Sequence, residues 1–159
     1  MEDRKGEHPW GDAGQLVLFG LFLAVWALDS FVLHATTVLT RSVPLALRLA
    51  VAFVLLAGSI VLLRMGRIAV TTPMRPARVI DTGAFRFTRH PLYLSGLLFY
   101  LALAAATLSL ASFAVVAGIF IFYDFIASFE ERVMEHKFGE AYRAYRKRTG
   151  KWGPRLLSR

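Results

Sequence analysis

The residues from Leu92 to Phe129 decide the fold of this chain. They read LYLSGLLFYLALAAATLSLASFAVVAGIFIFYDFIASF, and almost all of them are apolar. At about 1.5 Å of rise per residue, one unbroken helix of this length would be far longer than the roughly 30 Å hydrocarbon core of a bilayer. The run is therefore predicted to form two membrane passes folded back on each other. Such a hairpin carries the polar stretches on its two sides to the same membrane face.

The composition predicts that the whole chain lies in a membrane. Of its 159 residues 56% are hydrophobic, which leaves too little polar surface to cover a globular domain in water. We predict an all-α integral membrane helix bundle that forms a single domain over residues 1–159. Four membrane passes are predicted from the apolar stretches at about 16–33, 45–63, 92–108 and 111–129. The segments 64–91 and 130–159 are predicted to be cytoplasmic.

The polar segments carry signals of local structure. Pro73 and Pro76 indicate an irregular connection between the second and third passes, Asp81-Thr82-Gly83 resembles a turn, and Pro91 fits the first turn of a helix. After the fourth pass, apolar and aromatic residues recur at three- and four-residue spacing, namely Met134, Phe138, Tyr142 and Tyr145. This spacing predicts an amphipathic helix at the membrane surface that ends near Gly150.

The formal net charge is +8, and the basic residues are unevenly distributed. The segment between the second and third passes carries six arginines, namely Arg64, Arg67, Arg75, Arg78, Arg86 and Arg89. Nine further Lys or Arg residues follow Glu131, whereas the loop between the first two passes offers only Arg41. By the positive-inside rule, both termini and the long basic segment are predicted to be cytoplasmic, in a multi-pass protein of the bacterial inner membrane. No nucleic-acid-binding module is visible, and the sequence does not determine the oligomeric state.

Two short clusters could carry chemistry at the cytoplasmic face. Arg89-His90-Pro91 with Tyr93 stands where a loop becomes a membrane helix, so free backbone N–H groups and the positive helix end can meet an anion there. Arg89 is therefore one catalytic candidate, although lipid contact by Arg89 and helix capping by His90 would explain either residue alone. Glu130 and Glu131 end the fourth pass, where two carboxylates are costly unless they are solvated or paired.

Three further ionisable residues lie within or beside apolar stretches: Asp29, His34 and Asp124. Intramembrane ionisable residues are functional candidates by default. Asp124 is the better candidate because it lies less than two turns from Glu130, whereas Asp29 and His34 are assigned to helix packing or solvation at the opposite face. No residue pair has zinc-ligand spacing, and cysteine is absent, so no metal site is predicted.

The two clusters together resemble the motifs of a known family. The segment from Gly83 to Tyr93 reads GAFRFTRHPLY and resembles the pattern G-x-Y/F-x-x-x-R-H-P-x-Y. Glu130-Glu131 followed by the Phe138 to Tyr142 segment resembles the pattern E-E…F-G-x-x-Y. Both patterns belong to the isoprenylcysteine carboxyl methyltransferases and the related membrane-embedded phospholipid methyltransferases. The resemblance covers roughly residues 64–154, and the combination of both patterns is fairly specific.

The resemblance implies S-adenosylmethionine as the methyl donor, bound at the cytoplasmic mouth of the bundle. The positions that match cofactor-contacting residues of the family are Val79, Ile80, Phe85, His90, Pro91, Leu92, Tyr93 and Glu130. The chemistry of the donor agrees with these positions. Its carboxylate suits a helix N-terminus with Arg78 or Arg89, its amino and hydroxyl groups suit Glu130, and its adenine suits an aromatic side chain.

One departure from the family concerns the methyl acceptor. The prenylcysteine enzymes carry an Arg one turn before the binding Glu, and this position is Ile126 here. The predicted acceptor is therefore a carboxylate, amine or thiol of an unidentified lipophilic molecule or lipid that enters from the bilayer. An amine would need a base, for which Asp124 and Glu131 are the catalytic candidates. Two alternatives remain open, namely a nicotinamide-dependent membrane reductase of the same superfamily and a non-catalytic lipid-binding protein.

Overall fold

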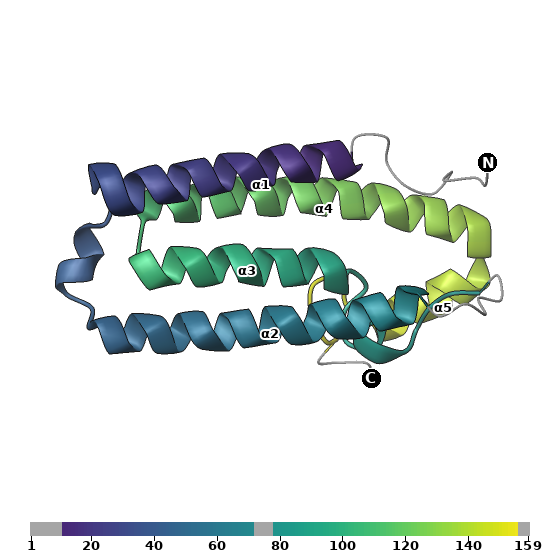
Figure 1. Ribbon diagram of the computed structural model, residues 1–159. Coiled ribbons are helices and arrows are strands. Elements are labelled where there is room, and N and C mark those ends of the chain that lie inside the picture. The colour runs from purple at the N-terminus through teal and green to yellow at the C-terminus, as the bar shows by residue number, and fades with distance from the viewer. Residues whose placement is uncertain (1–10, 72–77, 156–159) are drawn as a thin grey trace.

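The computed structural model describes residues 11–71 and 78–155, and the regular elements in these ranges are all helical (Figure 1). Pro73, Arg75 and Pro76, which the sequence places in an irregular connection, lie outside the described residues. The elements in chain order are α1 (Gly11–Ala27), a π-helical segment (Leu28–Leu33), a 3-10 turn (Val38–Arg41), α2 (Leu45–Thr71), a second 3-10 turn (Gly83–Arg86), α3 (Pro91–Thr107), α4 (Leu110–Phe138) and α5 (Glu140–Arg148).

The prediction of an all-α membrane helix bundle is confirmed. Three helical segments of the described chain are long and apolar enough to cross a membrane, namely Ala13–Leu33, Leu45–Val70 and Leu110–Phe138. The fourth apolar helix, α3, is shorter at 17 residues. Large apolar side chains also face outward, since Phe53 is 73% exposed and Ile121 is 69% exposed. A lipid environment explains such exposure, because a soluble protein rarely leaves large apolar surfaces uncovered.

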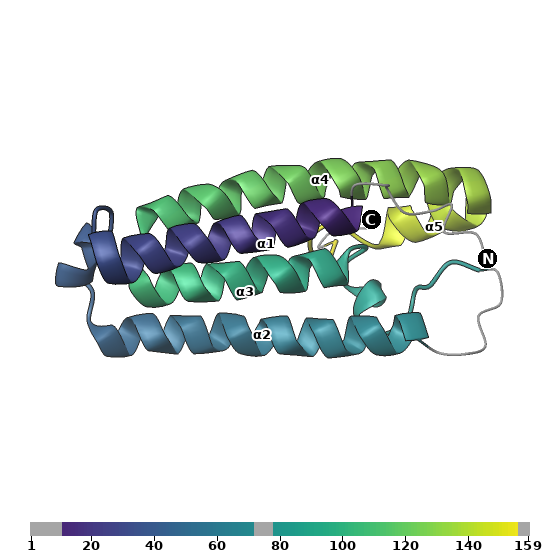
Figure 2. The same ribbon diagram turned by 45° about the horizontal axis from the view of Figure 1, so that its top comes forward.

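The helices pack as two pairs joined through α3. α1 lies along α4, α2 lies along α3, and α3 lies between α2 and the α1–α4 pair in both ribbon views (Figures 1 and 2). The buried core occupies the space among α1, α3 and α4, and its members are Phe22, Leu97, Tyr100, Val116, Ile119 and Tyr123. α1 and α2 stand on different sides of α3, and a groove lined by residues of both helices opens on this flank of the bundle.

The sequence explains how the α3–α4 hairpin begins and turns. Pro91 occupies the first turn of α3, as predicted, where its missing N–H leaves no hydrogen bond unmade. Leu108 ends α3 in a left-handed conformation with φ of 48°. Ser109 then caps α4, because its side chain accepts a hydrogen bond from the Ser112 backbone N–H at 3.1 Å.

Asp29, in the π-helical segment that follows α1, contacts this turn at the end of the bundle that lies opposite α5. Its carboxylate is 4% exposed and accepts hydrogen bonds from the Thr36 backbone N–H, the Thr36 hydroxyl and the Ser109 hydroxyl. These donors satisfy a carboxylate that would otherwise be costly to bury. The assignment of Asp29 to helix packing is confirmed, and His34 is exposed beside it.

The surface helix is shorter than the sequence indicates. α4 continues past Phe129 to Phe138 and breaks at Gly139, whose φ of 52° is a left-handed conformation that favours glycine. α5 then folds back over only nine residues. It is amphipathic as predicted, because Tyr142 and Tyr145 are buried while its basic side chains are exposed. This fold-back brings the chain after α5 against the start of α3.

Candidate functional site

A buried ion pair between Arg89 and Glu131 organises the polar end of the bundle. The Arg89 Nε lies 2.9 Å from the Glu131 Oε1, and its Nη2 lies 3.2 Å from the Oε2, so the pair is bidentate. The two side chains are 10% and 7% exposed. Arg89 lies two residues before the start of α3, and Glu131 lies on α4. The pair therefore fixes the start of one membrane helix against the end of another.

His90 lies between the two glutamates. Its Nε2 is 3.1 Å from the Glu131 Oε1, and its Nδ1 is 3.7 Å from the Glu130 Oε2. The His90 ring is also nearly parallel to that of Tyr93, with ring centroids 5.8 Å apart. One imidazole thus contacts both carboxylates that the sequence singled out, and the structure brings the two predicted clusters together.

The two glutamates differ in their surroundings. Glu131 is enclosed by cations, because Arg146 approaches its Oε2 at 3.7 Å in addition to Arg89. The Glu130 side chain is 23% exposed, and its Oε1 accepts a hydrogen bond from the Tyr93 hydroxyl at 2.5 Å. Glu130 is therefore the carboxylate of this pair that has accessible surface toward an incoming ligand.

The chain after α5 closes one side of the site, and we call residues 149–152 the C-terminal strap. The Arg89 backbone N–H donates to the Gly150 carbonyl at 3.0 Å, and the Arg89 Nη1 donates to the Thr149 carbonyl at 2.8 Å. The Thr88 hydroxyl donates to the Lys151 carbonyl at 2.7 Å. The strap also places the Trp152 ring beside His90, with centroids 6.0 Å apart. The guanidinium of Arg89 thus has most of its donors engaged by Glu131 and the strap.

Two buried tyrosines of α5 support this arrangement. The Tyr145 hydroxyl donates to the Phe85 carbonyl at 2.7 Å and holds the 3-10 turn before α3. Burial raises the pKa of both the Tyr142 and the Tyr145 phenols. The sign of this shift means that both stay protonated at neutral pH, so Tyr145 keeps the proton that it donates.

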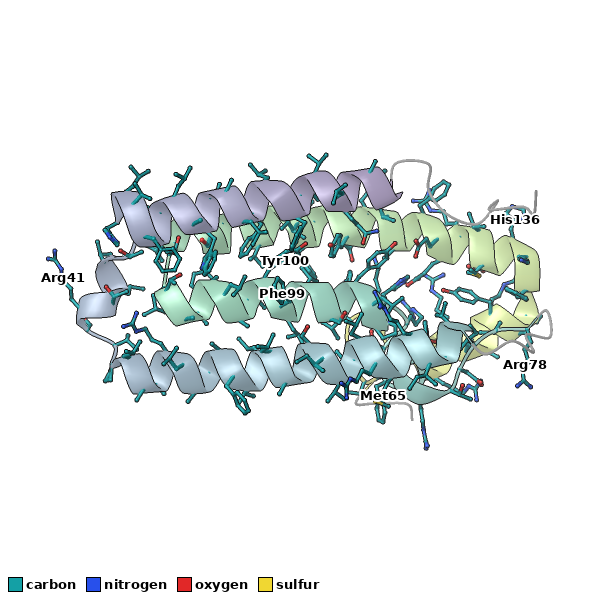
Figure 3. The ribbon with its side chains drawn as sticks, viewed as in Figure 1. Arg41, Met65, Arg78, Phe99, Tyr100 and His136 are labelled. Carbon is teal, nitrogen blue, oxygen red and sulfur yellow. The ribbon has the colours of Figure 1, made fainter. Side chains whose placement is uncertain are left out.

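The remaining residues predicted to contact a cofactor occupy different positions around this cluster. Val79, Ile80 and Phe85 are half-buried in the segment before α3, Pro91 is buried, and Leu92 is 37% exposed. Arg78 is exposed and lies at the same end of the molecule as His136, away from Arg41 at the opposite end (Figure 3). The structure brings Arg89, His90, Tyr93, Glu130 and Glu131 into one network. Their roles toward a ligand stay predictions.

Asp124, a predicted catalytic residue, anchors the strap. Its Oδ1 accepts hydrogen bonds from the Lys151 ammonium at 2.5 Å and the Trp152 indole N–H at 2.8 Å. Lys151 also donates to the Ser128 hydroxyl at 2.8 Å. Lys151 donates to the Asp124 backbone carbonyl as well, at 3.0 Å. The Asp124 carboxylate, the Asp124 carbonyl and the Ser128 hydroxyl of α4 therefore hold two residues of the strap.

These contacts give a prediction that separates anchoring from catalysis. If Asp124 anchors the strap, Asp124→Ala and Lys151→Met should both release Trp152 and, in a background where the other two tryptophans are phenylalanine, shift its fluorescence to the red; both should weaken ligand binding to a similar extent. A general base would behave differently, because Asp124→Ala alone would abolish turnover while Lys151→Met would not. Lys147→Met, at an exposed lysine of α5, is the matched control. An unchanged Trp152 spectrum in both variants would contradict the anchoring role.

An apolar groove leads from the site along the open flank of the bundle. It has a volume of about 580 Å³ and lies among α1, α2, α3 and α4. Its walls are mainly apolar, with Leu16, Phe19, Leu56, Ile60, Leu63, Leu92 and Phe99 among them. Polar groups also face it, namely Gln15, Ser59, Ser95, Tyr100 and Tyr123. Tyr123, which lines the groove, packs against Tyr93 with ring centroids 5.1 Å apart, so the groove ends close to the polar network.

The sequence also matches a known protein family. A family model described as phospholipid methyltransferase matches residues 42–141, which is more than half of the chain. The chain belongs to the phospholipid methyltransferase family. The resemblance seen in the motifs is thereby confirmed, and membership implies a membrane methyltransferase in general terms. No curated protein and no solved structure matches the chain in the corresponding searches.

Several residues of the site were missed by sequence reasoning. Lys151 carried no signal beyond its charge, and Trp152 lies after the predicted end of the surface helix, although both contact Asp124. Tyr100 and Tyr123 lie within predicted apolar helices, and nothing in the sequence around them distinguished them from the other residues of those helices. A hydroxyl-bearing aromatic in the middle of a membrane pass was the one available signal, because a buried phenol needs a hydrogen-bond partner.

Proposed function

We propose that this member of the phospholipid methyltransferase family transfers a methyl group from S-adenosylmethionine to a carboxylate, amine or thiol of a lipophilic molecule or lipid. The reaction would take place at the cytoplasmic membrane face. The observation that supports this best is the position of His90, Tyr93 and Glu130 beside the end of an apolar groove that is open along the flank of the bundle. A polar cofactor and a lipophilic acceptor could meet at that point from different sides.

The residues present fit such a cofactor. Glu130 offers an accessible carboxylate for amino or hydroxyl groups, and the start of α3 offers backbone N–H groups for a carboxylate. Tyr93 and Trp152 offer aromatic faces beside His90. Arg89 and Glu131 would act by positioning these groups, since their charged atoms are engaged with each other.

The chemistry follows from charge and solvation. The bound sulfonium would supply an electrophilic methyl group, and attack by an anion cancels charge, so an apolar groove that excludes water favours the reaction. Holding the acceptor in line can then supply much of the acceleration without a general base. Asp124 is paired with Lys151 and Glu131 with Arg89, so neither is a free base. An amine acceptor would therefore have to enter the site already neutral.

We also propose that the site end of the bundle faces the cytoplasm of a bacterial cell and that both termini lie there. The arginines of α2 near its end, Arg64 and Arg67, and Arg86 of the 3-10 turn support this orientation, because they lie at the same end as the site. All residues named for this site come from one chain.

Isothermal titration of the detergent-purified protein tests the proposal. S-adenosylhomocysteine, the demethylated product of the cofactor, is expected to bind with micromolar affinity, and NADPH is expected not to bind. Binding of NADPH alone would replace the proposal with the reductase alternative. A folded protein that binds neither ligand would favour the non-catalytic lipid-binding alternative, so the two titrations separate all three.

A further inference from the structure

Two tyrosine-containing pairs join α3 to α4 at different depths. The first pair is Tyr93 with Glu130, at the site. The second is Tyr100 with Tyr123, which pack in the same buried core cluster. Tyr100 follows Tyr93 by seven residues, and Tyr123 precedes Glu130 by seven residues on the antiparallel helix. At 1.5 Å of rise per residue the second pair lies about 10 Å deeper in the bundle than the first.

The deeper pair faces the apolar groove. Tyr100 and Tyr123 are among the groove's lining residues, although they are only 4% and 3% exposed. Figure 3 shows Tyr100 and Phe99 midway along α3, far from both ends of the bundle. A pair of phenols at this depth lies well inside the apolar part of the structure. Buried polar groups there require hydrogen-bond partners.

The pair keeps at least one hydroxyl proton for another acceptor. Two phenols carry two protons, and a hydrogen bond between the two hydroxyls could use only one of them. Among the residues that the structure describes, neither hydroxyl has a further partner. The other hydroxyls of the groove are committed, because Ser59 donates to the Ser95 carbonyl at 2.8 Å and Ser95 donates to the Leu92 carbonyl at 2.7 Å. The tyrosine pair therefore presents a donor to whatever occupies the groove.

We infer that Tyr100 and Tyr123 select the methyl acceptor by donating a hydrogen bond to an oxygen on its chain. This inference rests on the proposed function, since the acceptor is taken to occupy the groove. The expected acceptor is an amphiphile that bears a carbonyl oxygen about 10 Å below the polar group that meets the site. An otherwise identical molecule without that oxygen leaves the phenol unsatisfied and binds more weakly.

A matched pair of probes tests the inference. The probes are 9-oxooctadecanoate, whose ketone oxygen reaches the depth of the tyrosine pair when its carboxylate is at the site, and octadecanoate, which lacks the ketone. Binding is measured with radiolabelled probes on protein in nanodiscs of diether lipid, which contain no ester carbonyl. Wild-type protein is expected to prefer the keto acid by roughly three- to tenfold, the range for one hydrogen bond to a neutral group. The Tyr100→Phe/Tyr123→Phe double variant is expected to bind both probes alike.

The control is Ser59→Ala, which removes a hydroxyl of the same groove whose proton is already committed. This variant is expected to keep the preference. Equal affinities of the wild-type protein for both probes would overturn the inference and would indicate that water satisfies the phenol. A preference that persists in the double variant would also overturn it. S-adenosylhomocysteine binding is titrated in the same samples and tests the proposed function separately. A wild-type protein that does not bind S-adenosylhomocysteine would contradict the proposed function, whatever its preference between the two probes.

Discussion

Glu131→Ala is expected to lower the free energy of unfolding by about 3–5 kcal/mol, the largest stability loss predicted for any single change in this chain. The substitution removes the partner of Arg89 and leaves a guanidinium that is only 10% exposed without a carboxylate. It also removes the hydrogen-bond partner of the His90 Nε2. Reversible unfolding of the protein in mixed micelles, followed by circular dichroism, measures the change.

The reason for so large an effect is that one side chain joins several elements. Through Arg89, the Glu131 carboxylate fixes the start of α3 and the C-terminal strap. Through Arg146 it also contacts α5. Isolated surface ion pairs contribute little, but a buried charge that loses its partner carries the full cost of desolvation.

Two comparison variants make the result specific. Arg143→Ala breaks an ion pair of Arg143 with Glu135 and Glu140 that lies at the surface, and it should leave the unfolding transition in place. Adding Arg89→Met to Glu131→Ala removes the orphaned charge and should recover part of the lost stability. An unfolding curve of Glu131→Ala that superimposes on that of wild type would show that the pair does not hold the bundle together.

The sequence predicted those parts of the fold that depend on local pattern. The apolar run from Leu92 to Phe129 could form only a helical hairpin, and Pro91 marked the start of α3 because proline is favoured in the first helical turn. The start of the surface helix α5 could not be located in the same way. Gly139 separates α5 from α4 by adopting a positive φ, and glycine at that position in a helical pattern is compatible with a break or with continuation.

The sequence predicted which residues form the site but not how they are arranged. The motifs brought His90, Glu130 and Glu131 to one membrane face, yet neighbours on a helix diverge by about 100°, and the rotation of α4 against α3 decides which carboxylate is buried. Both glutamates turned out to contact His90. The anchoring of Lys151 on Asp124 depends on how the chain folds back after α5, which no local pattern encodes.

Glu130→Gln is expected to weaken S-adenosylhomocysteine binding by roughly tenfold or more while leaving the protein folded. A hydrogen bond to a charged group contributes about 1.5–3 kcal/mol, and replacing the carboxylate by an amide removes the charge but keeps the size of the side chain. The amide oxygen can still accept from Tyr93, so the packing of α3 on α4 should persist. Isothermal titration of the variant measures the affinity, and its unfolding transition verifies the fold.

The matched control for this prediction is Glu135→Gln, which neutralises a carboxylate of the same helix that pairs with Arg143 and Arg146. It should bind S-adenosylhomocysteine as the wild-type protein does. Tyr93→Phe should have an intermediate effect, because it leaves the Glu130 charge but removes the hydroxyl that orients it. If the folded Glu130→Gln variant keeps wild-type affinity, this carboxylate does not hold the cofactor. Glu131 could hardly replace it, since both of its oxygens already contact Arg89.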